Sequence, residues 1–361
     1  MGMNQPGASQ KALDLDDNFR FRVSKIEIPE PDEHEVLIKV SAAALNPGDW
    51  KIQRWGIKFG GRPVVPGMDT AGIVEKIGKG VHGFQLNDRV ITMGTWTRRS
   101  SAFQQYMCAE ARFTAKVPQE ISDEESASVP VGALAAWIGL YNHPHGAGHP
   151  HPFNDAPGID KVGPLLVIGG SSSVGQYVIQ FAKMSNFSPI ITTASLWHAN
   201  FLKELGATHV LNRDRTNENL ISDISDIVKG SFPIVFDAIS SADTKRFGHA
   251  MLATGGKLLT VDTRFGEFTT PPPESDFVPL NDEEELKSII PVRGVTVDPE
   301  TSSMAALLFQ KLYKLLETKV ILPNRVELLP GGLDAIAPGL ARLEHGMVSG
   351  IKLVIRPQET P

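Results

Sequence analysis

Cysteine is nearly absent from this sequence: Cys108 is the only one among 361 residues. A disulfide bond within the chain is therefore impossible, and a zinc site built on several thiolates is excluded. No apolar run is long enough to cross a bilayer, and the formal charge of −6, with no basic cluster, argues against a nucleic-acid-binding surface. The start, from Met1 to Pro6, has neither the positively charged nor the apolar segment of a secretory signal. We therefore expect a cytoplasmic protein that binds neither membranes nor nucleic acids.

The apolar and charged fractions, 41% and 21%, are those of a globular protein, and the length predicts two domains. Residues 21–115 contain short runs of alternating apolar and polar side chains between glycines and prolines, the pattern of β-strands. The clearest runs are Glu35–Val40, Thr70–Gly78 and Asp88–Thr92. This rhythm favours a compact, mostly antiparallel barrel over repeated strand–helix–strand units.

From Ser122 onward, helices and strands are expected to alternate. Ser122 and Glu125 form a capping box that predicts a helix start, and Val131–Tyr141 is apolar on nearly all sides, as in a buried helix. Strands are expected at 165–168, 189–193, 209–211, 234–238 and 257–261, and helices at 199–205, 220–228, 244–251 and 303–316. This alternation predicts a doubly wound α/β domain with a parallel sheet.

The last part of the chain predicts a helix at 333–345 and a strand at 352–355. The strand can return to the N-terminal barrel, which would make the barrel domain discontinuous. We therefore assign residues 1–130 and 318–361 to the barrel domain and residues 131–317 to the α/β domain.

One segment has the sequence of a phosphate-binding unit. The apolar strand Leu165–Ile168 runs into the small-residue turn Gly169–Gly175, and apolar residues then recur at helical spacing. Such a turn places backbone N–H groups and a helix N-terminus against a pyrophosphate. Gly170 and Gly175 keep the outer glycines of the dinucleotide fingerprint G-x-G-x-x-G, but Ser172 takes the middle position. The turn alone also fits an ordinary strand–helix connection.

Several separated motifs resemble those of one family, the medium-chain dehydrogenase/reductase superfamily. They are Leu45–Asp49, which resembles its N-P-x-D segment; Pro66–Gly72, its P-G-x-D-x-A-G segment; Asn87–Val90, a variant of G-D-R-V; Phe201–Ala207, the helix after the second Rossmann strand; and Ser349–Val354, its G-K-x-V end. Their order and spacing cover nearly the whole chain. The resemblance implies an α/β fold in which a GroES-like, β-barrel-type catalytic domain adjoins a doubly wound Rossmann domain that binds a nicotinamide cofactor.

The alcohol dehydrogenase branch of this superfamily holds a catalytic zinc with cysteine and histidine. Here Asn46 stands at the first ligand position, and the G-H-E segment reads Gly67-Met68-Asp69. Neither position offers a thiolate or an imidazole, so zinc-assisted alcohol oxidation is not expected. Hydride transfer to an activated C=C bond or to a quinone needs no metal, because the carbonyl group of the substrate accepts the charge.

The branch that this chain resembles most contains fungal enoyl reductases that act in trans with polyketide synthases. The motif Asn-Pro-x-Asp-x-Lys places Lys51 where those enzymes carry a lysine near the cofactor and substrate; without the resemblance, Lys51 could equally be a solvated lysine of the barrel. Ala135 stands where the family usually has a threonine beside the nicotinamide, so the mechanism of those reductases does not carry over in detail.

The resemblance implies NADPH-dependent reduction of an enoyl or α,β-unsaturated carbonyl substrate, with Lys51 as the catalytic residue. The substrate is a small molecule or an acyl chain, and a carrier protein of a polyketide synthase is a candidate partner. Two alternatives remain open: an NADPH quinone oxidoreductase, and a catalytically silent relative that binds NADPH.

The end of the second Rossmann strand predicts the coenzyme. NAD-specific domains carry an Asp or Glu there for the ribose 2′-OH, whereas this chain has Ser195, then His198 and, after the next strand, Arg213. These side chains can donate hydrogen bonds to a 2′-phosphate, so we predict NADPH, although His198 and Arg213 also suit an ordinary surface. The predicted cofactor-binding residues are Asn46, Gly169, Gly170, Ser172, Ser173, Val174, Ser195, His198, Arg213 and Lys352.

Four histidines, His143, His145, His149 and His151, lie within nine residues of a loop rich in proline and glycine. Imidazoles so close together suggest metal binding, but the loop offers no acidic partners and no fixed geometry. We expect a solvated surface insertion and predict no metal ligand in this chain.

Overall fold

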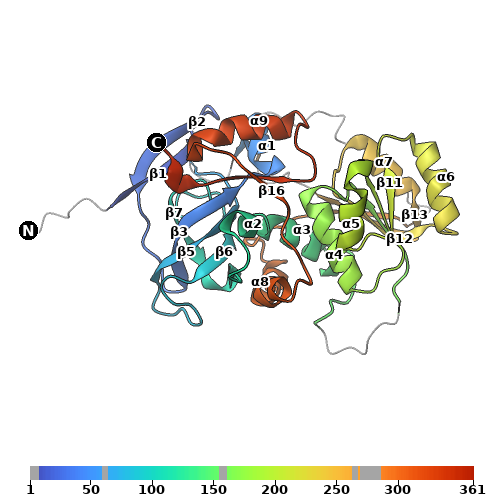
Figure 1. The fold of residues 1–361 in the computed structure, drawn as a ribbon, viewed down its shortest axis with the longest axis horizontal. Helices are drawn as coiled ribbons and strands as arrows, with labels where there is room; N and C mark the ends of the chain where they lie inside the picture. Colours follow the sequence, from blue (N-terminus) through green and yellow to red (C-terminus); the bar gives the residue numbers. More distant parts are fainter. Residues whose placement is uncertain (1–7, 59–63, 154–160, 262–266, 269–285) are drawn as a thin grey trace, which may run out of the picture.

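The structure is a computed structural model that describes residues 8–58, 64–153, 161–261, 267–268 and 286–361. A β-rich unit, formed by the N-terminal third and the C-terminal end of the chain, lies beside an α/β unit formed by the middle (Figure 1). This arrangement confirms the predicted fold class, a barrel-type domain next to a Rossmann domain. Within the described ranges, no helix is both long and apolar enough to cross a membrane.

The β-rich unit is built on a seven-stranded sheet. Its strands follow the order β16-β17-β3-β5-β6-β8, and β7 pairs with the first half of β3. The pairs are antiparallel except for β16–β17, which is parallel, so the predicted, mostly antiparallel character is confirmed. The strands are β3 (Glu35–Ala44), β5 (Asp69–Ile77), β6 (Arg89–Met93), β7 (Tyr106–Glu110), β8 (Thr114–Lys116), β16 (Val326–Leu328) and β17 (Lys352–Ile355).

Smaller elements complete this unit. A hairpin of β1 (Ser9–Leu15) and β2 (Phe21–Glu27) lies outside the main sheet, and the helices are α1 (Pro47–Trp55), α2 (Asp123–Ala127) and α9 (Ile336–Glu344). The predicted capping box starts α2: the N–H of Glu125 donates to Ser122 Oγ over 3.2 Å, and Glu125 Oε2 accepts from the N–H of Ser122 over 3.0 Å. The turn before β6 contains Asn87 at φ 70°, a left-handed conformation that asparagine tolerates better than most residues.

The C-terminal strand returns to the barrel, as predicted. β17 pairs antiparallel with the end of β3, through Val354 opposite Ala44. The long helix α8 (Ser302–Glu317) precedes this return and packs against both β8 of the barrel and α3 of the α/β unit. The domain limits at residues 130 and 318 stay a prediction.

The α/β unit contains a six-stranded parallel sheet in the order β11-β10-β9-β12-β13-β15. The strands are β9 (Leu165–Ile168), β10 (Ile190–Ala194), β11 (His209–Asn212), β12 (Phe232–Asp237), β13 (Leu252–Val261) and β15 (Ser288–Val292). The chain runs outward from β9 to β11 and then crosses back to β12. The carboxyl ends of β9 and β12 therefore flank the topological switch point, where open α/β sheets bind ligands.

The helices of this unit are α3 (Pro130–Tyr141), α4 (Ser173–Met184), α5 (Ala199–Leu205), α6 (Asn217–Ile227) and α7 (Ala242–Ala250). Helix α3 lies between the two units (Figure 1), and every residue of it except Val131 is buried, as its apolar sequence predicts. Gly139 allows β12 to pack closely, because a Cβ there would lie 2.4 Å from the ring of Phe236. A further link joins the units: β14 (Glu267–Phe268) pairs with β4 (Ile57–Lys58), just after α1.

The histidine-rich loop after α3 differs from the expected solvated insertion. The ring centre of His149 lies 4.8 Å from that of Phe187, and that of His151 lies 5.7 Å from that of the buried Trp137. Burial lowers the pKa of both His149 and His151, which keeps them neutral at pH 7. Two of the four imidazole rings thus pack against aromatic side chains, whereas His143 is exposed and His145 Nε2 lies 2.7 Å from the carboxylate of Glu300. The part of the chain that the structure describes contains no group of three side chains suited to hold a metal.

Candidate active site

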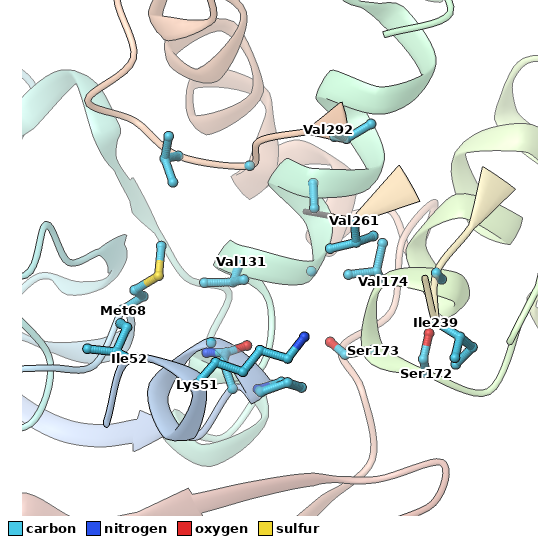
Figure 2. A pocket seen from close by; sticks show the side chains of 18 of the residues that line it. Lys51, Ile52, Met68, Val131, Ser172, Ser173, Val174, Ile239, Val261 and Val292 are labelled. Atoms are coloured by element: carbon cyan, nitrogen blue, oxygen red, sulfur yellow. The ribbon is translucent and has the colours of Figure 1, made fainter. Parts of the chain in front are cut away.

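A pocket lies between the two units, at the switch point of the parallel sheet. Figure 2 shows Lys51, Ile52 and Met68 on the barrel side, facing Ser172 and Ser173 at the start of α4. Most of the wall is apolar. Its aliphatic and thioether side chains include Ile52, Met68, Val131, Val174, Val261 and Val292.

The turn after β9 approaches its neighbours so closely that its glycines cannot carry side chains. A Cβ on Gly170 would lie 2.1 Å from Thr192 Oγ1, and a Cβ on Gly175 would lie 2.4 Å from the carbonyl oxygen of Gly169. Gly169 itself adopts φ 78°, in the left-handed region that favours glycine. These glycines let the turn pack tightly against β10 and the start of α4, and the turn meets the pocket through Ser172, Ser173 and Val174.

Two serines organise the start of α4. Ser172 is the N-cap residue, and its hydroxyl accepts a hydrogen bond from the N–H of Gly175 over 3.1 Å. The Ser173 hydroxyl donates to Asn324 Oδ1 over 2.5 Å, which fastens the segment before β16 to the helix. Because the first N–H groups of a helix have no partner within it, the start of α4 presents backbone donors and a positive dipole to the pocket. An anionic group such as a pyrophosphate fits these donors.

Lys51 extends from α1 across the pocket toward Ser173 (Figure 2). Its ammonium group lies 5.7 Å from the ring centre of Trp50 and 5.3 Å from that of Trp55, where aromatic faces attract a cation. Among the residues that line the pocket in the described chain, Lys51 is the one with a charged side chain. The pocket therefore combines one positive charge with apolar walls.

A buried polar cluster stands behind Asn46, which lines the pocket. The Asn46 amide donates to Asp69 Oδ2 over 2.9 Å and accepts from the Lys352 ammonium group over 2.6 Å. Lys352 Nζ also lies 2.8 Å from Asp69 Oδ2, with both side chains buried, and Asp69 Oδ1 accepts a hydrogen bond from the N–H of Val131 over 2.8 Å. Asp69 thus joins strands β5 and β17 to the start of α3.

A second group of polar side chains lies at the carboxyl ends of β10 and β11. His198 is buried, and its ring nitrogens lie 3.1 Å from Ser349 Oγ and 3.1 Å from the guanidinium group of Arg325. Burial, assisted by the charges of Arg325 and Arg213, lowers the pKa of His198, so its imidazole is neutral at pH 7. The Arg325 guanidinium lies 4.0 Å from the ring centre of Phe201. His198 therefore connects the Rossmann unit to the C-terminal segment.

Arg213 and Ser195 complete this group. The N–H of Arg213 donates to the carbonyl oxygen of Ala194, at the end of β10, over 3.0 Å. Its side chain is 53% exposed, and Nε lies 3.6 Å from the carboxylate of Asp214. Ser195 is buried and stands where NAD-specific domains place an acid.

Ala135 of α3 lines the pocket and is buried. The segment after β15 crosses it closely, because a Cβ on Gly294 would lie 2.7 Å from Ala135 Cα. The small side chain at position 135 thus permits this close crossing.

The structure brings five of the predicted residues into one pocket: Asn46, Lys51, Ser172, Ser173 and Val174. Gly169 and Gly170 form the turn behind them, whereas Ser195, His198 and Arg213 form the second group and Lys352 is buried behind Asn46. Four polar residues with structural roles here were not predicted: Asp49, Asp69, Asn324 and Arg325. The motifs N-P-x-D and P-G-x-D contain the two aspartates and could have indicated them, but no sequence motif marks Asn324 or Arg325.

A barrel-type unit, a Rossmann sheet and a pocket that joins them at a helix N-terminus define a two-domain, nucleotide-dependent oxidoreductase fold. The family models for an alcohol dehydrogenase GroES-like domain and for a zinc-binding dehydrogenase match residues 32–119 and 173–289. The chain belongs to the medium-chain dehydrogenase/reductase superfamily, in its enoyl reductase branch, whose members use a nicotinamide cofactor.

Individual proteins support this assignment. The chain is 32% identical to the trans-enoyl reductase resD of Aspergillus sclerotiorum, over 91% of this chain and 94% of that protein. It is 29% identical to the trans-enoyl reductase ACTTS2 of Alternaria alternata, over 96% and 99%. The solved structure of the quinone oxidoreductase from Coxiella burnetii has a similar fold, with a TM-score of 0.70 and 21% identity over 97% of this chain and 99% of that one.

Proposed function

We propose that this protein is an NADPH-dependent, zinc-free reductase of activated C=C bonds, acting on an enoyl or α,β-unsaturated carbonyl substrate. The observation that carries the proposal is the pocket in which Lys51 faces the helix N-terminus at Ser173 between apolar walls. The similarity to trans-enoyl reductases supports this reaction, and it also makes an acyl chain on a polyketide synthase carrier protein a candidate substrate.

The side chains of the pocket suit hydride addition to a conjugated carbonyl compound. When bound, the reduced nicotinamide supplies the hydride. The Lys51 ammonium group would stabilise the negative charge that develops on the carbonyl oxygen as the β carbon accepts the hydride. The apolar wall around Ile52, Met68 and Val131 excludes water and strengthens this electrostatic interaction.

The residues at the pocket do not fit a catalytic zinc ion. Asn46 and Met68 offer an amide and a thioether, and the carboxylate of Asp69 is already held by the Lys352 ammonium group at 2.8 Å. A zinc ion would have to displace this ammonium group and would find neither thiolate nor imidazole. We therefore assign no metal to the reaction.

The polar group at the end of β10 favours NADPH. Ser195 offers a hydroxyl in place of an acid, and Arg213 and Arg325 bring two positive charges to the same end of the sheet. Guanidinium groups bind a 2′-phosphate through charge-assisted hydrogen bonds, whereas a 2′-OH gains little from them. Because His198 is buried and bonded to Arg325 and Ser349, we assign it the role of orienting Arg325.

Turnover with two electrophiles tests the proposal. The purified protein is expected to oxidise NADPH in the presence of an α,β-unsaturated ketone, with a kcat/KM about tenfold or more above that for NADH, since one charge-assisted contact contributes about 1.5–3 kcal/mol. If the protein oxidises NADPH with a quinone but not with the α,β-unsaturated ketone, the quinone reductase alternative is favoured. Quenching of intrinsic fluorescence by NADPH without turnover of either electrophile would favour the silent relative.

Replacement of Lys51 by methionine tests its catalytic role. Because it removes the only charge that we place on the developing oxyanion, K51M is expected to lower kcat about 10²–10³-fold. The affinity for NADPH, measured by fluorescence titration, is expected to stay within about twofold of wild type, a change under 0.5 kcal/mol. The matched control is K79M, at an exposed lysine of the barrel. Unchanged turnover in K51M would remove Lys51 from the mechanism.

A further inference from the structure

A second carboxyl group, that of Asp49, is buried directly behind the wall formed by Asn46. Asp49 is 1% exposed, and its Oδ2 accepts a hydrogen bond from the N–H of Asn46 over 2.8 Å. Its other oxygen, Oδ1, has no hydrogen-bond partner among the residues that the structure describes. A buried carboxylate with an unsatisfied oxygen is costly, so a neutral acid is the less costly form here.

The charged groups around Asp49 come from four elements, β5, β17, α1 and α9. Asp69 of β5 and Lys352 of β17 face it from the barrel, and their side chains pair at 2.8 Å. On α1 itself, Lys51 points toward the pocket (Figure 2). Helix α9 packs on α1, and its Glu344 pairs with the exposed Arg54 of α1 at 3.1 Å. One buried ammonium group therefore faces two buried carboxyl groups.

These surroundings favour the protonated form of Asp49. Burial, followed by the nearby charge of Asp69, raises its pKa from 3.8 to about 7, against the opposing effects of the Asn46 N–H, Lys352 and the backbone of Gly67. Asp49 can therefore change its charge near neutral pH, next to a residue of the pocket wall.

We propose that Asp49 is a positioning residue of the active site: as a neutral acid it leaves Lys352 to hold the side-chain amide of Asn46, and on ionisation it draws Lys352 away. The Lys352 ammonium group donates to Asn46 Oδ1 and pairs with Asp69, and a second carboxylate would compete for it. Asn46 Oδ1 would then lose the hydrogen bond from Lys352 that fixes the side-chain amide at the pocket. This inference rests on the proposed function, because its consequence is a change in reductase activity with pH.

The pH profile of two asparagine variants tests the inference. The wild-type kcat/KM with NADPH and an α,β-unsaturated ketone is expected to fall at least tenfold between pH 6 and pH 9, through one ionisation near 7. D49N, which stays neutral, is expected to match wild type at pH 6 and to lose this fall. D17N, the same replacement at an exposed aspartate of the β1–β2 turn, is expected to keep the wild-type profile. A D49N profile that falls as the wild type does would overturn the proposal, as would loss of activity at every pH in a folded D49N.

Stability measurements separate this inference from the proposed function. The folded-state pKa of Asp49, about 7, lies above the ordinary value of 3.8, so its contribution to stability is complete below pH 3.8 and is lost as pH rises to 7. The stability of D49N relative to wild type is thus expected to increase between pH 4 and 7 and then to level off; a pH-independent difference would contradict the assigned ionisation. If D49N does not fold, D49S replaces it, and its pH profile of kcat/KM and its stability relative to wild type are compared in the same way. A wild type without reductase activity would defeat the proposed function, and the stability arm would still decide whether Asp49 ionises near 7.

Discussion

Replacement of Lys352 by methionine is expected to lower the free energy of unfolding by about 3–5 kcal/mol, the usual cost of removing one partner of a buried ion pair. Methionine has nearly the same length, but it leaves the carboxylate of Asp69 buried without its ammonium partner at 2.8 Å and the Asn46 amide without its donor at 2.6 Å. Urea denaturation of the two proteins measures the difference. Because Asp69 also binds the start of α3, reductase activity is expected to be lost together with stability.

The control for this variant is E327Q, which weakens an ion pair that is partly exposed. Glu327 and Arg342 pair at 2.6 Å, with 39% and 32% of their side chains exposed. Such pairs contribute about 0–1 kcal/mol, so E327Q is expected to unfold close to the wild-type urea concentration. Equal effects of K352M and E327Q would show that the buried cluster does not hold the barrel to α3.

Replacement of Gly175 by alanine is expected to raise the Kd for NADPH about 100-fold or more. The added Cβ would lie 2.4 Å from the carbonyl oxygen of Gly169 and 2.8 Å from Gly170 Cα, and these backbone atoms cannot rotate away as a side chain can. The turn must therefore shift, and losing two charge-assisted hydrogen bonds to phosphate costs about 3–6 kcal/mol.

The matched control is G163A, which makes the same change just before β9. A Cβ on Gly163 would meet no atom within 4 Å, so wild-type affinity is expected. Isothermal titration with NADPH compares the variants, and circular dichroism shows whether each is folded. Wild-type affinity in a folded G175A would contradict the assignment of the pyrophosphate to this turn.

Residues whose role depends on local sequence were predictable. The strand–turn–helix pattern around Gly169–Gly175 located the start of α4, because a buried strand followed by small residues and an amphipathic helix is compatible with few other backbone arrangements. The motif around Asn46 and Lys51 led to two residues that line the pocket between the two units. The buried helix α3 followed from an apolar sequence on nearly all its sides.

Residues whose role depends on distant partners were not predictable. Lys352 was expected at the cofactor, but its burial against Asp69 arises only when β17 pairs with β3. Asn324 and Arg325 gain their roles because the segment before β16 crosses α4 and His198, a contact that no spacing in the sequence encodes. The packing of His149 and His151 also depends on the rings of Phe187, which is distant in the sequence, and of Trp137, which is buried in α3.

The most direct test of the central claim follows the hydride itself. NADPH that carries deuterium at C4 of the nicotinamide, prepared as each of the two epimers, is incubated with the protein and an α,β-unsaturated ketone, and the product is analysed by mass spectrometry and NMR. One epimer is expected to deliver deuterium to the β carbon of a saturated ketone. Deuterium at the carbonyl carbon of an allylic alcohol, or an unlabelled product from both epimers, would contradict the assignment of this pocket as a C=C reductase.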